Sequence, residues 1–249
     1  MGKNILFTSG KGGTGKTASA AAVASCLALL GHRTICLDCD VGLKNLDLAL
    51  GVSDRSVMDF TDVLSGEVSL SDAAAAHPDI ENLWFLSAPS TALVEEIDPD
   101  AMKALGDELR KEFDFCVIDG PAGIGKNFRL AAAPADSAIV VANGDAACLR
   151  DGQRAVMELH SLGLEDVRLL VNRVRGFFFK CTSSTIDDVI DNVGARLIGV
   201  IPEDKDVLLS GGLEKPLVLY NKDSRALRQF NAVARRIAGE DVPLGKIKA

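Results

Sequence analysis

The sequence has 249 residues, of which 47% are hydrophobic and 25% charged, and its net charge is −8. These values are ordinary for a globular enzyme with a largely aliphatic core, and we expect a single domain over residues 1–249. The negative charge disfavours non-specific attraction to nucleic acid or to an anionic membrane. The longest apolar run, residues 18–31, is shorter than the about 20 residues that a membrane-spanning helix needs.

The hydrophobic pattern alternates between segments of strand length and segments of helical periodicity. A short apolar strand at residues 5–8 leads into a glycine-rich turn, and a helical stretch from Lys16 stops at Gly31. Further runs of strand length lie at residues 34–38, 83–86, 115–118, 137–142, 167–171 and 196–200. Apolar spacings of three and four predict helices at residues 99–113, 150–162, 185–193 and 224–238. This order predicts an α/β fold, a three-layer doubly wound and mostly parallel sheet flanked by helices.

Six cysteines are spread through apolar stretches, at positions 26, 36, 39, 116, 148 and 181. Cys36 and Cys39 have a C-x-x-C spacing, but in a strand residues three apart point to opposite faces. We therefore interpret them as packed thiols. Scattered free thiols are typical of the reducing cytosol, so we expect a cytoplasmic protein. The three histidines lie far apart from one another in the sequence, and no regular zinc pattern is visible.

The glycine-rich turn satisfies the phosphate-binding pattern G-x-x-x-x-G-K-[ST]. Its residues are Gly10, Lys11, Gly12, Gly13, Thr14, Gly15, Lys16 and Thr17. Between a strand and a helix, such glycines allow backbone N–H groups to converge on phosphate oxygens at a helix N-terminus. We expect Lys16 to reach the β- and γ-phosphates of ATP and Thr17 to bind Mg²⁺. The alternative is a glycine turn with two surface lysines.

Lys11 is not required by this general pattern. The stretch Lys-Gly-Gly-x-Gly-Lys-Thr resembles the deviant Walker A box of the MinD/ParA family of P-loop ATPases. In that family the first lysine reaches across a nucleotide-sandwich dimer to the partner's ATP. The resemblance therefore implies a homodimer with ATP, in which Lys11 and Lys16 are both catalytic. Ala18 stands where the family often has Thr, which removes a hydroxyl near the α-phosphate but keeps the N–H, so we expect nucleotide binding to persist.

Carboxylates follow two of the predicted strands. Asp38 and Asp40 leave a strand end near the expected Mg²⁺, where they can order its water and orient the attacking water. A solvated strand end is the alternative. The stretch at residues 38–47 is similar to the first switch of the MinD branch, and this resemblance assigns the attacking water to Asp40. Asp119, before residues 120–124, resembles the Walker B and second-switch aspartate and is expected to hold the magnesium shell.

Residues near the predicted nucleobase come from the later strands. Asn172 precedes Arg173, and an Asn amide can pair with both N6 and N7 of adenine. Related ATPases carry Asn there, and the stretch around Pro202 resembles the family's I-P-E-D loop against the base. We therefore expect Ala18, Asn172, Arg173 and Pro202 to bind the cofactor, ATP or ADP. An R-D pair, Arg150 and Asp151, also matches the family, but its spacing predicts no role.

Three stretches depart from the family's pattern. Gly120 replaces a common Ser beside Asp119, and residues 143–145 replace a T-N-P-E-like stretch. Residues 239–249 contain Pro243 and Gly245, which argue against the amphipathic C-terminal helix of membrane-cycling relatives and hence against direct membrane binding. The run of phenylalanines at residues 177–179 is either loop core or an apolar patch for a partner.

The resemblance implies an ATP-dependent dimerisation switch in the spatial regulation of cell division, at septum site placement. Its expected partners are proteins of a division-site or positioning system, and its expected location is cytoplasmic, with attachment to the inner face of the membrane through partners. A ParA-type or flagellar-number ATPase that positions DNA or another cargo is an alternative. So are an iron–sulfur carrier that uses Cys116 or Cys148, and a nucleotide-binding scaffold without turnover. There is no strong nucleic-acid signal.

Overall fold

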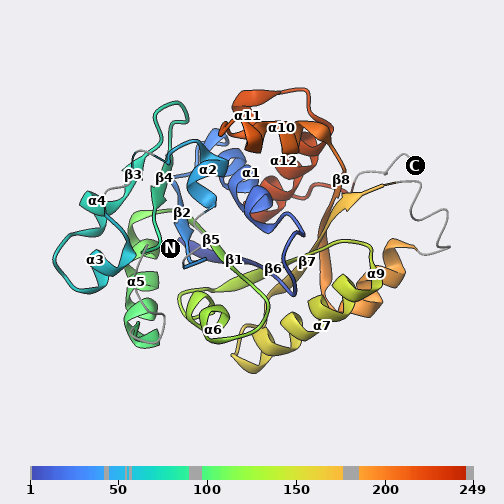
Figure 1. Cartoon of the computed structure of the whole chain (residues 1–249), viewed down its shortest axis with the longest axis horizontal. Helices are drawn as coiled ribbons and strands as arrows, with labels where there is room; N and C mark the ends of the chain where they lie inside the picture. Colours follow the sequence, from blue (N-terminus) through green and yellow to red (C-terminus); the bar gives the residue numbers. More distant parts are fainter. Residues whose placement is uncertain are drawn as a thin grey trace.

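The computed structural model describes residues 2–41, 45–53, 55, 58–89, 97–175 and 185–244. These residues form an eight-stranded sheet in the order β3-β4-β2-β5-β1-β6-β7-β8 (Figure 1). Its strands are β1 (Lys3–Ser9), β2 (Thr34–Asp38), β3 (Ala75–Ala76), β4 (Leu83–Leu86), β5 (Phe115–Ala122), β6 (Ser137–Ala142), β7 (Val167–Val174) and β8 (Arg196–Pro202). Neighbouring strands are parallel except for β3, which pairs antiparallel with β4.

Helices cover both faces of this sheet, so the predicted three-layer α/β fold is confirmed (Figure 1). One face carries α1 (Lys16–Leu29), α2 (Leu46–Leu50), α10 (Lys205–Gly212), α11 (Leu217–Tyr220) and α12 (Arg225–Ile237). The other face carries α5 (Pro99–Glu112), α6 (Lys126–Ala132), α7 (Ala146–Ser161) and α9 (Ile186–Val193). The short helices α3 (Phe60–Leu64) and α4 (Leu70–Ala73) join this second core near the β3 edge.

The sheet separates two hydrophobic cores, because alternate strand residues point to opposite faces. In β1, Ile5 and Phe7 belong to the core under α1 and α12, whereas Leu6 belongs to the core on the other face. Cys36 and Cys39 divide in the same way, one in each core. The C-x-x-C pair is therefore two packed thiols, as predicted. The other described cysteines are also buried and free, and Cys181 lies outside the described residues.

Two helix boundaries show how local chemistry sets the ends. Helix α1 ends at Leu29 and is followed by Gly31 with a positive φ of 92°, close to the predicted stop. Helix α7 begins at Ala146, four residues before the predicted start, because Asp145 caps it by accepting the backbone N–H of Cys148 at 2.9 Å. The apolar pattern alone did not reveal this first turn.

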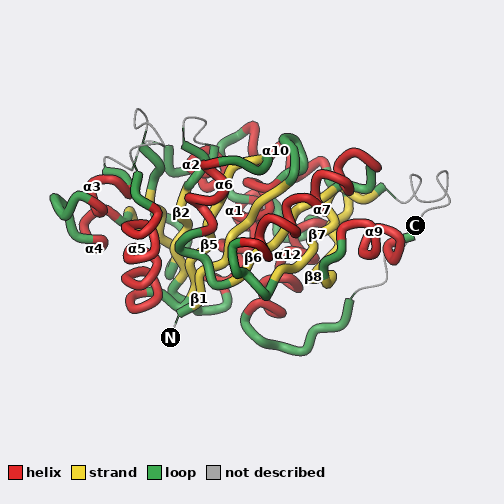
Figure 2. Tube along the Cα trace, turned by 90° about the horizontal axis from the view of Figure 1, so that it is seen from below, coloured by secondary structure: helices red, strands yellow, loops and turns green. Residues whose placement is uncertain are grey.

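Several short elements were not predicted from the sequence. They are β3, α2, α3, α4, α6, α10 and α11, of two to eight residues each. Segments this short carry too few apolar residues to establish a period. The longer strands lie side by side between the helices in Figure 2, with the amino terminus at the lower edge of the sheet.

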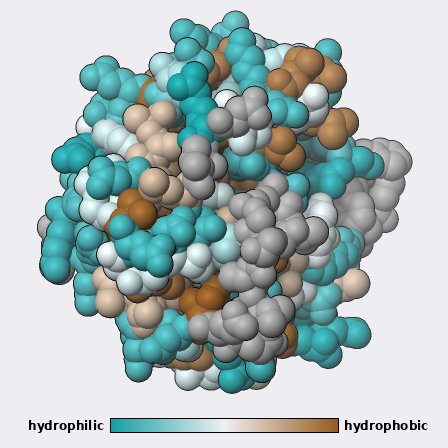
Figure 3. Space-filling model, turned by 60° about the vertical axis from the view of Figure 1, so that its left-hand side comes forward, coloured by the Kyte–Doolittle hydropathy of each residue, from teal (hydrophilic) through white to brown (hydrophobic). Residues whose placement is uncertain are grey.

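The outer surface is mixed in character. On the face shown in Figure 3, hydrophobic side chains form small groups among hydrophilic ones. Such scattered exposure is ordinary for a folded chain. No helix within the described residues has both the length and the apolar character to cross a bilayer.

Candidate functional site

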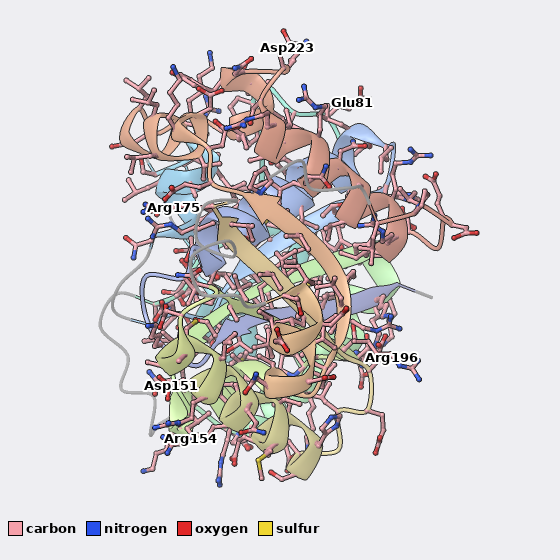
Figure 4. The ribbon with its side chains drawn as sticks, turned by 90° about the vertical axis from the view of Figure 1, so that its right-hand side faces the viewer. Glu81, Asp151, Arg154, Arg175, Arg196 and Asp223 are labelled. Atoms are coloured by element: carbon pink, nitrogen blue, oxygen red, sulfur yellow. The ribbon has the colours of Figure 1, made fainter. Side chains whose placement is uncertain are left out.

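The candidate site lies where the parallel strands end. The glycine-rich loop follows β1, Asp38 ends β2, Asp119 lies within β5 and Asn172 lies near the end of β7. Parallel strands bring their carboxyl ends to one edge of a sheet, where ligands bind in open α/β folds. Figure 4 shows Arg175, after β7, on the same side of the molecule as Asp151 of α7, with Arg196 at the start of β8 on the opposite side.

The glycines of the loop are required by its geometry. Gly13 and Gly15 have φ angles of 79° and 86°, which disfavour other residues. A Cβ added at Gly12 or Gly13 would meet nothing within 4 Å, so the space above the loop is open. At Gly15, by contrast, a Cβ would lie 2.4 Å from Nδ2 of Asn172. The loop is therefore packed on its inner side and open where phosphates are expected.

Lys16 lies inside a cluster of carboxylates. Its Nζ is 2.6 Å from Oδ1 of Asp119 and 3.8 Å from Oδ2 of Asp40. The Lys16 side chain is 7% exposed and that of Asp119 is 1% exposed. Lys16 also donates to the hydroxyl of Thr17 at 3.3 Å. The structure thus brings together the four predicted residues Lys16, Thr17, Asp40 and Asp119.

Asp38 and Asp119 carry more negative charge into this interior than Lys16 can balance. The two are register partners across β2 and β5. Burial, reinforced by the charge of Asp119, raises the pKa of Asp38 to about 7. Burial also raises the pKa of Asp119, although Lys16 acts in the opposite direction. Oδ2 of each aspartate is buried without a hydrogen-bond partner among the described residues.

These two oxygens fit a divalent cation. Mg²⁺ prefers carboxylate, hydroxyl and water oxygens, and a cation would compensate both buried charges. The Thr17 hydroxyl lies beside the same cluster, 3.3 Å from Nζ of Lys16. The donor set is therefore suited to Mg²⁺ bound partly through water, with Thr17, Asp38 and Asp119 nearest to it.

A cavity of about 670 Å³ adjoins the loop. Gly15, Ala18, Asn172, Arg173 and Pro202 all line it, so the residues predicted for the nucleoside converge on one space. Helix α10 closes its far side with Val207, Leu208 and two glycines, a contribution that sequence reasoning missed because α10 itself was missed. A volume of this size accommodates a nucleoside.

Asn172 has a second role that the sequence did not indicate. Its Nδ2 donates to the carbonyl of Thr14 at 2.8 Å, and its Oδ1 accepts the backbone N–H of Arg173. One amide hydrogen and one oxygen lone pair are left for other partners. Asn172 therefore supports the loop, and its pairing with adenine stays a prediction.

Arg173 adopts an unusual backbone conformation. Its φ is 56°, and the pairing of β7 with β8 shifts register between Val171 and Val174. The guanidinium donates to the carbonyl of Gly13 at 3.2 Å and lies 3.6 Å from Glu203, which also pairs with Arg175. Arg173 is thereby directed from the end of β7 onto the loop.

Lys11 lies apart from the carboxylate cluster. Its Nζ donates to Oδ1 of Asp145 at 2.8 Å, at the start of α7. Asp145 was noted in the sequence only as a departure from the family's pattern, and its contact with Lys11 was not foreseen. Within the first switch, residues 42–44 lie outside the described residues, as does the phenylalanine run at residues 177–179.

Comparisons with known proteins agree with this geometry. The CobQ/CobB/MinD/ParA nucleotide binding domain matches residues 5–217. The septum site-determining protein MinD of Thermotoga maritima is 39% identical over 247 residues, covering 98% of this chain and 91% of the relative. MinD in the MinC:MinD cell division complex of Aquifex aeolicus superposes with a TM-score of 0.90 at 34% identity, covering 98% of each chain.

A third relative was solved with a nucleotide. MinD of Pyrococcus horikoshii, complexed with Mg-ADP, has a TM-score of 0.83 and 30% identity, and the match covers 95% of this chain and 96% of that one. The resemblance inferred from the glycine-rich loop is thus confirmed. The chain belongs to the CobQ/CobB/MinD/ParA family of nucleotide-binding domains, and within it to the septum site-determining MinD group.

Proposed function

We propose that this chain is a magnesium-dependent ATPase that acts as an ATP-driven dimerisation switch in placing the division septum. The observation that carries the proposal is the buried cluster of Lys16 with Asp119 and Asp40, beside the unpartnered oxygens of Asp38 and Asp119. A cluster of this kind at a phosphate loop is suited to phosphoryl transfer, in which positioning and charge stabilisation supply most of the catalysis. The septum role is preferred over cargo positioning because the relative at 39% identity has that role.

Different residues of the site bind the phosphates and the magnesium ion. The backbone N–H groups of residues 10–17 receive the phosphates, and Lys16 exchanges its contact with Asp119 for the β- and γ-phosphate oxygens. Thr17, Asp38 and Asp119 would hold Mg²⁺, which would supply positive charge against the phosphates. With a cation held there, the buried carboxylates of Asp38 and Asp119 would stay compensated when Lys16 contacts the phosphates.

Asp40 orients the attacking water. Its carboxylate is within 3.8 Å of Lys16, and its backbone N–H donates to Oδ1 of Asp38 at 2.9 Å. This bond holds Asp40 at the mouth of the cluster, where a water aligned with the terminal phosphate would be in reach. Ala18, Asn172, Arg173 and Pro202 hold the nucleoside in the adjoining cavity.

Lys11 supplies the intersubunit contact. Its side chain is directed away from its own carboxylate cluster and toward α7, at an exposed position. In the proposed homodimer Lys11 reaches the ATP of the partner subunit and stabilises the charge that develops on transfer. The dimer is the form that engages a protein partner of the division system, by analogy with the MinC:MinD complex of Aquifex aeolicus.

Attachment to the membrane is proposed to occur through partners. This proposal rests on the protein partners that the family resemblance implies, by analogy with the MinC:MinD complex of Aquifex aeolicus. The iron–sulfur alternative gains no support, because Cys116 and Cys148 are each 1% exposed and lie in the core rather than on a surface that a second subunit could share.

The test uses a chain in which hydrolysis is blocked. With ATP and Mg²⁺, Asp40→Ala is expected to elute as a dimer in size-exclusion chromatography with light scattering, and Asp40→Ala/Lys11→Ala as a monomer. Asp40→Ala/Lys3→Ala is a matched control, since Lys3 also makes an exposed ion pair, with Asp166 at 3.2 Å, but on the far end of β1. Monomers in all three cases would contradict the sandwich dimer, and unchanged turnover in Asp40→Ala would contradict the hydrolysis assignment.

A further inference from the structure

Asp145 makes two contacts with one carboxylate oxygen. Its Oδ1 accepts the backbone N–H of Cys148 at 2.9 Å, which caps α7, and it accepts Nζ of Lys11 at 2.8 Å. The Lys11 backbone is itself held, because the Ser9 hydroxyl donates to its carbonyl at 2.9 Å. One side chain thus joins the signature lysine to the start of a 16-residue helix.

Helix α7 is positioned to keep this contact in place. A Cβ at Gly10 would lie 2.2 Å from the backbone carbonyl of Asp151, so the first two turns of α7 pack directly against the loop. Only glycine allows such a close approach. The separation between the backbones of the loop and of α7 is therefore set by packing, which keeps the Lys11 and Asp145 side chains within reach of each other.

The pair is nevertheless open to exchange. The Lys11 and Asp145 side chains are 36% and 45% exposed. The hydrogen bond to Asp145 raises the pKa of Lys11. Burial alone would raise the pKa of Asp145, but hydrogen bonds from Lys11 and from the Cys148 N–H lower it. Both groups are thus held in their charged forms by a contact that salt and competing phosphate can weaken.

We propose that Asp145 is a positioning residue that retains Lys11 within its own chain, so that the intrachain pair competes with the contact of Lys11 to the partner subunit's nucleotide. This inference rests on the proposed function of Lys11 in the ATP-bound dimer. Each subunit gives up one Lys11–Asp145 pair when the dimer forms. Asp145 therefore raises the protein concentration at which the ATP-bound chain dimerises.

Asp145→Asn separates the two contacts of this residue. An asparagine oxygen still accepts the Cys148 N–H and still caps the helix, but its neutral amide holds Lys11 weakly. In the Asp40→Ala background with saturating Mg-ATP, Asp145→Asn is expected to lower the dimer dissociation constant roughly three- to thirty-fold at low salt, since two exposed ion pairs no longer oppose association. At about 0.5 M salt the difference should shrink below about twofold.

Asp98→Asn is the matched control. Asp98 also caps a helix, accepting the N–H of Asp100 at the start of α5, and none of the hydrogen bonds found among the described residues joins it to the loop. It is expected to leave the dimer dissociation constant and its salt dependence unchanged. Sedimentation velocity over a range of protein concentrations measures the dimer dissociation constant of Asp40→Ala alone, with Asp145→Asn and with Asp98→Asn.

The outcomes separate the two proposals. If the Asp40→Ala chain, which is the parent in this experiment, never dimerises, the proposed function and this inference are overturned together. A parent dimer whose dissociation constant is the same in Asp145→Asn, or is weakened by it, overturns the inference alone. A gain that does not depend on salt also contradicts it, because a purely structural effect of the substitution would not respond to ionic strength.

Discussion

Two lysines of one glycine-rich loop, five positions apart in the sequence, lie in opposite environments. Lys16 is buried, with its Nζ 2.6 Å from Asp119, whereas Lys11 is exposed and pairs with Asp145 at 2.8 Å. The contact distances are similar, but the surroundings are not. Lys16 compensates Asp119, whose side chain is 1% exposed, while both members of the Lys11 pair remain partly solvated.

The difference in burial determines which of the two lysines can contact a second chain. Removing one member of a buried pair leaves an uncompensated charge, so Lys16 can leave Asp119 only when another cation replaces it. An exposed pair contributes little and is readily exchanged. Lys16 is therefore suited to bind nucleotide within its own subunit, and Lys11 is suited to change partners.

The largest expected effect comes from the buried lysine. Lys16→Ala should lower ATP turnover by at least about 10³-fold and abolish tight nucleotide binding, because it removes the cation next to the phosphates. Steady-state ATPase assays and nucleotide titration measure both quantities. Lys103→Ala, an exposed lysine of α5 paired with Asp100, is the control and should behave as the parent. Retained turnover in Lys16→Ala would contradict the assignment of the buried lysine to phosphate binding.

The buried carboxylates predict a pH dependence of stability. Burial raises the pKa of Asp38 from its ordinary 3.8 to about 7 in the folded chain, so the folded state retains a proton that the unfolded state releases. The retained proton stabilises the folded state fully below about pH 4, and this stabilisation is lost as the pH rises through 7. Asp38→Asn cannot ionise, so its stability advantage over the parent should grow by about 3 kcal/mol at most between pH 5 and pH 8.

Urea unfolding without nucleotide and with a chelator measures this advantage at each pH. Asp223→Asn, at an exposed position before α12, is the control and should keep a constant difference from the parent. A stability gap between Asp38→Asn and the parent that stays constant, or that narrows as the pH rises, would show that Asp38 is not held protonated in the interior.

The exposed lysine should affect turnover without affecting binding. Lys11→Ala is expected to lower the ATPase rate by about 10²-fold while nucleotide affinity changes by less than about threefold, since Lys11 contacts neither cation site nor cavity of its own chain. The remaining rate should no longer rise with protein concentration. Lys3→Ala, on the far end of β1, should retain the concentration dependence. Equal losses of binding in Lys11→Ala and Lys16→Ala would remove the distinction between the two lysines.

The fold class and the location of the phosphate site follow from the sequence without the structure. Long apolar strands alternating with amphipathic helices admit few arrangements other than a doubly wound sheet, and every predicted strand appears within four residues at each end. The loop from Gly10 to Thr17 could be recognised because its chemistry depends on local spacing. Asp38, Asp40 and Asp119 could be proposed because parallel strands bring their carboxyl ends to one edge.

The partner of each of these groups, by contrast, depends on tertiary packing. Nothing local in the sequence pairs Lys11 with Asp145, 134 positions later, or places Asn172 against the carbonyl of Thr14. The cavity wall formed by α10 and the close approach of Asp151 to Gly10 were equally hidden, because each depends on packing between distant elements. Spacing predicts which groups face one edge of the sheet, but burial and distance decide which charges are compensated and which are free to exchange.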